Sequence, residues 1–328
     1  MQPSRSTPRT TGASLPYVAA IVVTVLWASS FVLIKWGLSD IPPLYFATLR
    51  YALAFAVLLA VQATFGRRGQ KSGTSSALHS MPRRQATLLV VAGITGYTIA
   101  QGFQFVGLSY LPAVTTSFVL TFTPIFVLVL GVGLLGEGTS LLQLGGLGLA
   151  LVGAWAFFSA NVAWGGQWLG VLVVVVSGVG WAVYLVTVRF LQRSGYVGSL
   201  RLTTTTMGIG VAGMAVLTAL SGQYAALTAD SVLTIVWLAT VNTALAFFMW
   251  NWALKSIPAY ELTVLQNVML VEIALFAFVF LQETITYVMV AGMALVLAGV
   301  FVVQAQVVRR GSKSVAPVAP NSERRAGV

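Results

Sequence analysis

Long apolar stretches without charged residues dominate this chain and limit the folds open to it. Between Arg84 and Arg189 the only charged residue is Glu137. Across the 328 residues, 58% are apolar and 8% are charged, whereas soluble domains carry roughly 25% charged residues. A membrane-spanning helix needs about 20 predominantly apolar residues, so this stretch alone holds about four spans. The sequence therefore excludes a water-soluble globular protein and predicts a polytopic membrane protein.

Ten apolar segments of suitable length follow one another along the chain. They cover residues 16–36, 44–65, 87–108, 112–135, 140–160, 168–188, 199–221, 231–254, 259–281 and 286–307. Backbone polar groups in lipid must be satisfied within the spanning segment, which favours helices. We therefore predict an all-α fold of ten transmembrane helices, with a tail at residues 1–15 and a disordered tail at residues 308–328.

Lys and Arg are distributed unevenly between the two sides of the predicted membrane. With ten spans both termini lie on one side, so alternate connections can be compared. Of the 18 Lys and Arg residues, all except Lys35 and Arg50 are assigned to the side of the termini. The positive-inside rule then places both termini in the cytoplasm. Membrane topology explains the basic charge, so no nucleic-acid partner is expected, and binding to anionic membrane lipids remains a second possibility.

The residue types needed for most metal and redox chemistry are scarce. The chain has no Cys and a single His, His79, which lies in a polar basic stretch. Disulfides, Cys-ligated zinc and iron–sulfur clusters are therefore excluded. The sequence also lacks a Walker A motif and an HExxH motif. No cofactor, metal site or enzymatic activity is expected.

The two halves of the chain repeat one sequence plan. Six residues recur 146 positions later: Leu108, Pro112, Ala113, Glu137, Gly146 and Gly153 correspond to Leu254, Pro258, Ala259, Glu283, Gly292 and Gly299. Each half, 16–160 and 161–307, contains five predicted spans, and an odd number inserts the second half in the opposite orientation. Inverted repeats of this kind are typical of secondary transporters, which bind substrate near the midplane between the repeats.

These residues resemble the EamA family of the drug/metabolite transporter superfamily. The resemblance rests on Trp27-Ala-Ser-Ser-Phe31, Lys35, Pro42, Phe46, Arg50, Leu108-Ser-Tyr-Leu-Pro-Ala113, Pro124, Glu137, Gly146 and Gly153, and on Trp181, Arg189, Ile257-Pro-Ala259, Gln282-Glu283, Gly292 and Gly299. It implies a ten-helix carrier of the cell inner membrane, often an exporter of amino acids, metabolites or small toxic compounds. It also implies a central cavity lined by the third, fourth, eighth and ninth spans and parts of the first and sixth.

Glu272 is the most conspicuous polar residue within a predicted span. An ionised carboxylate at this depth is costly, so Glu272 is expected to be protonated, paired with a cation or placed in a wet cavity. Two hypotheses follow. In the first, Glu272 binds a substrate amine or couples transport to protons. In the second, it forms a structural hydrogen bond between helices.

Polar side chains also mark the third, eighth and ninth spans. Tyr97, Gln101 and Gln104 follow the i, i+4, i+7 spacing of one helix face. Amides both donate and accept hydrogen bonds, which suits a zwitterionic or hydroxylated ligand, although amides also join helices to one another. Further candidates for binding substrate are Asn251, Gln266 and Asn267.

An aromatic side chain is expected in corresponding places of the two halves. Trp27 and Ser30 in the first span have Trp181 and Tyr184 as counterparts 154 residues later. An aromatic wall binds apolar or aromatic ligands. The alternative is that these rings only fill space between helices.

Charged residues close to span ends suggest anchors or gates. Lys35 and Arg189 lie at the far ends of the first and sixth spans, where long side chains reach the interface or close a pathway. Glu137 and Glu283 precede the fifth and tenth spans and are expected either to favour the N-termini of those helices or to pair with a basic gate residue.

Pro124 is predicted to kink the fourth span. Proline removes a backbone hydrogen bond, and the hydroxyls of Thr121 and Thr123 lie close enough in sequence to satisfy the freed carbonyls. A kink there is a candidate hinge. The second half has Leu270 at the corresponding position, so the halves are not expected to contribute equally.

Together these features favour a secondary carrier for a small-molecule substrate, working by alternating access. The other hypotheses are a membrane-embedded receptor or scaffold and a lipid-modifying enzyme. A scaffold would require a folded soluble domain, and an enzyme would require acidic residues or His clustered at one interface. The sequence shows neither feature, and it does not define an oligomeric state.

Overall fold

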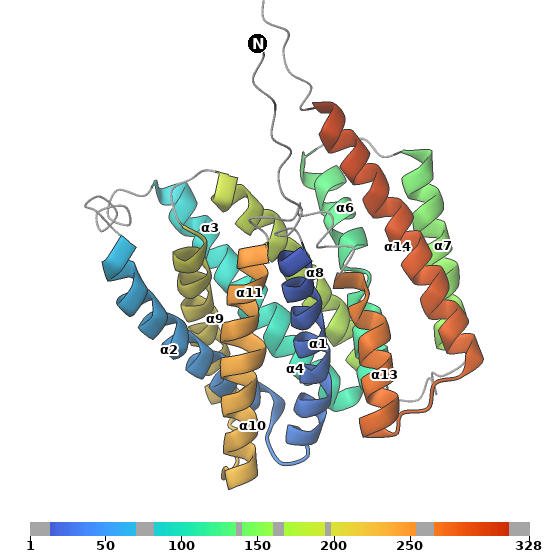
Figure 1. The fold of residues 1–328 in the computed structure, drawn as a ribbon. Coiled ribbons are helices and arrows are strands. Elements are labelled where there is room, and N and C mark those ends of the chain that lie inside the picture. The colour runs from blue at the N-terminus through green and yellow to red at the C-terminus, as the bar shows by residue number, and fades with distance from the viewer. Residues whose placement is uncertain are drawn as a thin grey trace, which may run out of the picture.

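The computed structural model describes residues 14–69, 82–135, 140–159, 167–193, 198–253 and 266–314. Over these residues the chain is helical and contains no β-strand (Figure 1). The elements are α1 (Ser14–Gly37), α2 (Pro43–Gly69), α3 (Arg83–Gly93), η1 (Ile94–Ile99), α4 (Ala100–Tyr110), α5 (Ala113–Leu120), α6 (Thr123–Leu135), α7 (Leu141–Ser159), α8 (Trp168–Arg193), α9 (Ser199–Ser221), α10 (Ala229–Ala239), η2 (Thr240–Leu245), α11 (Ala246–Ala253), α13 (Met269–Leu281) and α14 (Tyr287–Ser314).

The helices have the length and composition required to cross a bilayer. In the described ranges, seven helices are long and apolar enough to span, and three shorter apolar helices cover Ala113–Val127, Met269–Leu281 and Tyr287–Val303. The prediction of an all-α polytopic membrane protein is therefore confirmed. One boundary differs: α14 runs to Ser314, beyond residue 308, where the C-terminal tail was predicted to begin.

Helix boundaries repeat between the two halves of the chain. The elements α3, η1, α4, α6 and α7 begin at residues 83, 94, 100, 123 and 141, whereas α10, η2, α11, α13 and α14 begin at 229, 240, 246, 269 and 287. Each pair is separated by the 146 residues that also separate the repeated sequence positions. Both halves include a π-helical segment, η1 and η2, at the same place. The sequence repeat thus extends to details of local structure.

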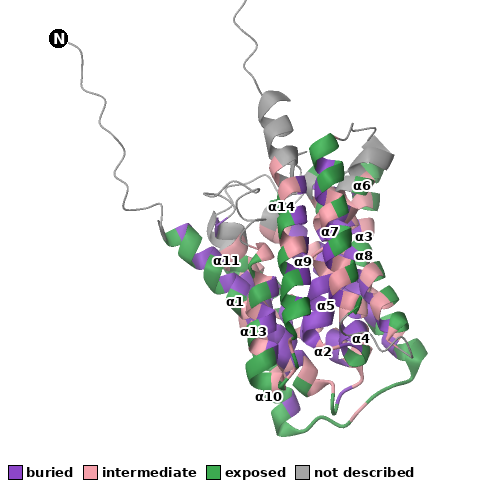
Figure 2. Cartoon of the chain, turned by 90° about the vertical axis from the view of Figure 1, so that its right-hand side faces the viewer, coloured by how far each residue is buried: buried purple, intermediate pink, exposed green. Residues whose placement is uncertain are grey.

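Buried residues lie on the inner faces of the bundle, and exposed residues cover its outside (Figure 2). Phe118 and Phe157 stack with ring centroids 3.9 Å apart and are fully buried. Many exposed side chains, such as Leu141 and Leu220, are also apolar. A helix that is apolar all round is buried in a large core or in a membrane. The burial pattern therefore agrees with a lipid-facing outer surface.

Glycines allow α7 and α14 to approach each other at one edge of the bundle (Figure 1). A Cβ atom built on Gly146 would lie 2.8 Å from the carbonyl oxygen of Gly299. On Gly153 it would lie 2.7 Å from the carbonyl oxygen of Gly292. Small residues permit such close backbone approach in membranes, where association depends on packing. These four glycines thus bring the fifth predicted helix of each half into direct contact.

We expect Gly153→Ala to destabilise the protein, because the new methyl group collides with backbone atoms that cannot rotate away. The cost of such overpacking is about 1–3 kcal/mol. Gly148→Ala is the matched control, since Gly148 lies on the same helix and a Cβ atom added there would have no other atom within 4 Å. Thermal unfolding in detergent should show a lower midpoint for Gly153→Ala alone. Equal midpoints would contradict the close contact.

The fourth span is broken just before Pro124, where the sequence predicts a kink. The break covers residues 121–122, between α5 and α6. Pro124 has no N–H to donate to the carbonyl of Leu120, and the Thr123 hydroxyl donates to that oxygen instead, at 2.7 Å. The Thr121 hydroxyl donates to the Ser117 carbonyl at 3.0 Å. The Thr123 hydroxyl therefore satisfies the carbonyl that the proline frees, whereas the Ser117 carbonyl also accepts the backbone N–H of Thr121.

Candidate functional site

Polar side chains from both halves of the chain meet inside the bundle. We call this group the interior polar cluster. It consists of Ser29, Ser30, Arg50, Tyr51, Tyr97, Gln101, Tyr184, Asn242 and Thr243. The first half supplies its members on α1, α2, η1 and α4, and the second half supplies those on α8 and η2. A polar group placed between two apolar halves is the kind of site that binds a solute in a membrane carrier.

Asn242 connects η2 to α1 at one side of the interior polar cluster. Its Nδ2 donates to the carbonyl of Leu26, and it lies 3.0 Å from the hydroxyl oxygens of both Ser29 and Ser30. Asn242 is fully buried, and its Oδ1 has no hydrogen-bond partner among the described residues. Ser30, predicted to bind substrate, is therefore part of this cluster.

Arg50 contacts Thr243, the residue that follows Asn242 in η2. The Arg50 Nε donates to the Thr243 hydroxyl at 3.0 Å, and that hydroxyl donates to the Leu238 carbonyl at 2.8 Å. The guanidinium carbon lies 5.4 Å from the ring centroid of Tyr51 and 5.8 Å from that of Phe105. Cation–π contacts at such distances are attractive. Arg50 is thus held by one hydrogen bond and two aromatic rings.

Tyrosines form another part of the interior polar cluster. The Tyr51 hydroxyl donates to Gln101 Oε1 at 2.6 Å. The hydroxyls of Tyr97 and Tyr184 lie 3.5 Å apart, and the Tyr184 ring stacks on Trp181 with centroids 4.8 Å apart. Four predicted site residues, Tyr97, Gln101, Trp181 and Tyr184, therefore lie in or beside one cluster.

Other predicted residues lie elsewhere or outside the described side chains. Gln104 is half-buried and makes no hydrogen bond to another described side chain or backbone group. Gln266 and Asn267 are half-buried in the short stretch before α13. Asn251 in α11 and Arg189 in α8 have side chains outside the described set.

Trp27 contacts a different group of aromatic residues. Its ring centroid lies 5.6 Å from that of Phe247 and 5.0 Å from that of Trp250. Both partners belong to α11. These contacts are those expected from the hypothesis that Trp27 fills space between helices.

Glu272 belongs to α13 and contacts Thr24 of α1. The Thr24 hydroxyl lies 3.1 Å from Glu272 Oε1 and 2.8 Å from the carbonyl oxygen of Ile21. Glu272 Oε2 is buried and has no hydrogen-bond partner in the part of the chain that the structure describes. The contact with Thr24 is the helix–helix hydrogen bond of the structural hypothesis, while the unpartnered oxygen leaves room for the coupling hypothesis.

Lys35 holds the end of α4 at one end of the bundle. Its Nζ donates to the carbonyl of Leu108 at 2.9 Å and to that of Leu111 at 3.0 Å. These carbonyls belong to the last turn of α4 and the residue that follows it, where helix carbonyls lack backbone partners. Lys35 thus joins α1 to α4.

Glu283 holds the start of α5, directly after that turn. Its Oε1 accepts from the Ala113 N–H at 2.6 Å and its Oε2 from the Val114 N–H at 3.0 Å. The expectation that Glu283 favours the N-terminus of its own following helix is therefore wrong. Thr286 accepts from the N–H of Met289 at the start of α14, so that helix has a separate cap. We call the contacts of Lys35 and Glu283 with residues 108–114 the Lys35–Glu283 clamp.

Known proteins share the sequence plan that produces this geometry. The model of the EamA-like transporter family matches residues 14–159 and 168–304. The chain belongs to the EamA-like transporter family. An uncharacterized transporter of Archaeoglobus fulgidus is 26% identical over 89% of this chain and 98% of its own length. A probable amino-acid metabolite efflux pump of Salmonella typhimurium is 25% identical over 86% of this chain and 92% of its own.

A crystal structure also shares the fold. It aligns with a TM-score of 0.61 at 20% sequence identity and covers 90% of this chain and 99% of the solved one. Family membership makes the chain a transporter, and it confirms the resemblance seen in the sequence.

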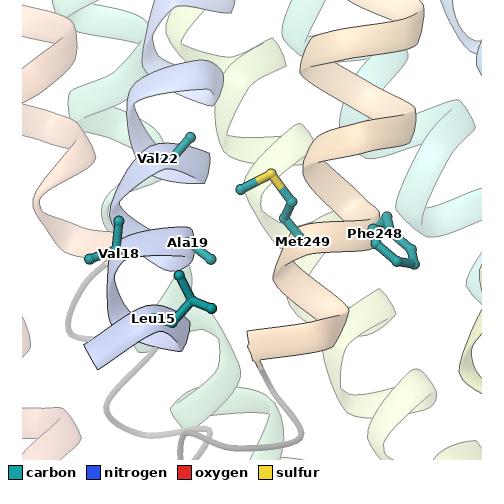
Figure 3. Close-up of a pocket in the computed structure, with 6 residues that line it drawn as sticks. All are labelled: Leu15, Val18, Ala19, Val22, Phe248 and Met249. Carbon is teal, nitrogen blue, oxygen red and sulfur yellow. The ribbon is translucent and has the colours of Figure 1, made fainter. Parts of the chain in front are cut away.

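In this EamA-like transporter, a groove between α1 and α11 differs from the interior polar cluster (Figure 3). It has a volume of about 360 Å³ and is lined only by apolar residues: Leu15, Val18, Ala19, Val22, Phe248 and Met249. Binding sites for small molecules combine apolar walls with a few placed polar groups. The groove offers none, and four of its residues have exposed side chains. We therefore place the candidate substrate site at the polar cluster.

Several residues of this EamA-like site could not be found from the sequence. Arg50 was counted only among the charges on the side opposite the termini, whereas its side chain is 5% exposed within α2. A single arginine inside an apolar segment is the signal that indicates an interior charge. Asn242 and Thr243 were also missed, because one amide and one hydroxyl in a long apolar span give only a weak signal.

Proposed function

We propose that this EamA-like transporter is a secondary-active or facilitative exporter of amino acids or related small metabolites and drugs. Transport proceeds by alternating access, and the interior polar cluster binds the substrate between the two halves. The proposal is supported chiefly by the placement of this cluster, because both halves contribute polar groups to it within otherwise apolar helices. The similarity to the Salmonella typhimurium protein, a probable amino-acid metabolite efflux pump, supports the substrate class.

The proposed architecture is ten transmembrane helices in two inverted five-helix repeats, at residues 16–160 and 161–307. Two observations support it: the helix boundaries repeat at an interval of 146 residues, and the family model matches two successive stretches. Five helices per repeat invert the second repeat. The distribution of Lys and Arg supports an inner-membrane location with both termini in the cytoplasm.

Four residues are proposed to control access to the site. Lys35 closes one end through the Lys35–Glu283 clamp, and Arg189 is its counterpart in the second repeat. Pro124 provides a hinge, because the break between α5 and α6 interrupts helix hydrogen bonding without leaving the Leu120 carbonyl unsatisfied. Glu272 couples transport to protons. Trp27, Gln104, Asn251, Gln266 and Asn267 are retained as residues that line the substrate pathway.

Reconstitution into liposomes tests the proposed function. Purified protein would be assayed for transport of a labelled panel of the twenty amino acids and a panel of drugs, with and without an imposed pH gradient. We expect saturable transport of at least one amino acid above the rate in protein-free liposomes. Absence of transport for both panels in both directions would reject the carrier proposal.

Glu272→Gln distinguishes coupling from structural support. A proton-coupled carrier is expected to lose its response to the pH gradient in this variant, because an amide does not exchange protons in this range. The Thr24 hydroxyl has one proton but two nearby oxygen atoms, so a protonated Glu272 that donates to Thr24 would satisfy both contacts.

Thr24→Val is the matched control, since it removes the contact with Glu272 and keeps the carboxyl group. We expect Thr24→Val to retain the response to the pH gradient. If both variants lose folded protein equally and neither changes the pH response, the role of Glu272 is structural.

A further inference from the structure

Arg50 is a buried cation without a described counter-ion. Its side chain is 5% exposed within α2, about 10 Å along the helix axis from Pro43. In the ranges that the structure covers, the four carboxylates of Asp40, Asp230, Glu272 and Glu283 form neither an ion pair nor a hydrogen bond with it. Ionisable residues inside membrane spans are costly and mark functional sites. The position of Arg50 therefore needs a reason beyond helix packing.

The surroundings of Arg50 fix its orientation and leave one edge of the guanidinium unused. Nε donates to Thr243, and the rings of Tyr51 and Phe105 lie beside the cation. A guanidinium carries five N–H donors. Over the described residues, Nη1 and Nη2 donate to no acceptor. The remaining donors form the planar fork that matches the two oxygens of a carboxylate.

We propose that Arg50 binds the carboxylate of the transported substrate through Nη1 and Nη2. The substrates are therefore small organic acids, among them α-amino acids. The inference rests on the proposed transport function, because it assigns the interior polar cluster to substrate. Thr243 is a positioning residue, since it holds Nε so that the fork keeps one direction. The Tyr51 ring lies beside Arg50, and the Tyr51 hydroxyl donates to Gln101, so this pair offers polar contacts to the rest of the ligand.

Protein stability distinguishes a binding role of Arg50 from a purely structural one. A buried cation that serves only as a bridge between helices loses its partners when it is removed, so Arg50→Met would destabilise the protein. A binding residue costs stability, and replacing a buried charge with an apolar side chain of similar volume is often neutral or stabilising. We therefore expect Arg50→Met to melt at the same or a higher temperature than the parent.

Ligand binding to the full chain in detergent tests the proposal. The probes are the twenty amino acids, the carboxamide of each, and the carboxylates pyruvate, phenylpyruvate and benzoate, and the readout is the ligand-dependent melting temperature. For any amino acid that binds, we expect its carboxamide to bind at least tenfold more weakly. Arg50→Lys is expected to lower affinity for the acid about tenfold, because an ammonium cannot make the bidentate contact. Thr243→Val is expected to have a smaller effect in the same direction.

The outcomes separate this inference from the proposed function. Equal binding of acid and carboxamide, or unchanged acid binding in folded Arg50→Lys and Arg50→Met, would overturn the inference and leave amino-acid transport standing. Binding of pyruvate, phenylpyruvate or benzoate through Arg50, without binding of any amino acid, would support the inference and reject the amino-acid proposal. If none of the carboxylates binds the parent protein, the inference is overturned.

Discussion

Replacing Glu283 with glutamine is expected to open the end of the bundle at which Lys35 lies. The carboxylate accepts two N–H groups at the start of α5, at 2.6 and 3.0 Å. Hydrogen bonds to a charged group contribute about 1.5–3 kcal/mol each, and the helix N-terminus adds to the attraction. Glutamine removes the charge and leaves one oxygen in place of two. A loss of about 2 kcal/mol would shift the population of open and closed forms roughly thirtyfold.

Distance measurements between spin labels report that opening. The chain has no native Cys, so Ser109→Cys and Thr284→Cys can be labelled without competing sites. Both positions are exposed. Thr284 directly follows Glu283, and Ser109 lies in the last turn of α4, shortly before the start of α5 to which Glu283 binds. We expect Glu283→Gln to add a population of molecules in which the two labels are farther apart than in the parent. Lys35→Met is expected to add the same population. Asp40→Asn is the control, because Asp40 is an exposed carboxylate in the turn that follows α1. A distribution identical to that of the parent would show that the clamp does not hold this end closed.

Gly96→Ala is expected to lower the transport rate more than tenfold. Gly96 lies in η1, and a Cβ atom there would overlap the ring of Tyr184. Tyr97 is fully buried and Tyr184 is 6% exposed, so the ring has no free space to enter. Its displacement would break the hydroxyl contact with Tyr97 and the stacking on Trp181. The position of Tyr184, which the second half contributes to the interior polar cluster, would then change.

Gly102→Ala provides the comparison on the adjoining helix. A Cβ atom at this position would lie 3.6 Å from Leu44 Cδ2, which is an ordinary van der Waals contact. Initial rates in proteoliposomes, normalised to folded protein, should be near those of the parent for Gly102→Ala. Transport by Gly96→Ala at the parental rate would exclude a role for Tyr184 in the pathway.

The fold was largely predictable, because helix formation in a membrane depends on local properties of the sequence. Apolar length located the spans, and the sequence repeat anticipated the matching helix boundaries. The break at Pro124 was predictable to the level of a single hydrogen bond, because the loss of a proline N–H affects a known carbonyl four residues earlier. Gly146 and Gly153 pointed to close helix contact for the same reason: a missing side chain has a direct geometric effect.

The candidate site was only partly predictable, because its contacts join helices that are distant in sequence. Helical periodicity placed Tyr97 and Gln101 together, and both belong to the interior polar cluster. The same periodicity grouped Gln104 with them, but Gln104 is half-buried in α4 and forms no hydrogen bond with a described residue of the cluster. Arg50 was assigned by charge counting, which does not distinguish a cation at the interface from one facing inward. Glu283 was assigned to its neighbouring helix, whereas its partners lie in the other half of the chain.

The glycine contact between α7 and α14 has a mechanical consequence. Two helices whose backbones touch can rotate about the point where they cross, but they cannot move closer together. If they move apart, they lose the packing contacts that hold them together. Each helix is the last of its half, so the two halves are tied together at this edge. If the two halves rotate relative to each other during transport, this helix pair lies at the axis of rotation. The displacement of the backbone is then smallest at the glycines and largest in the helices farthest from them.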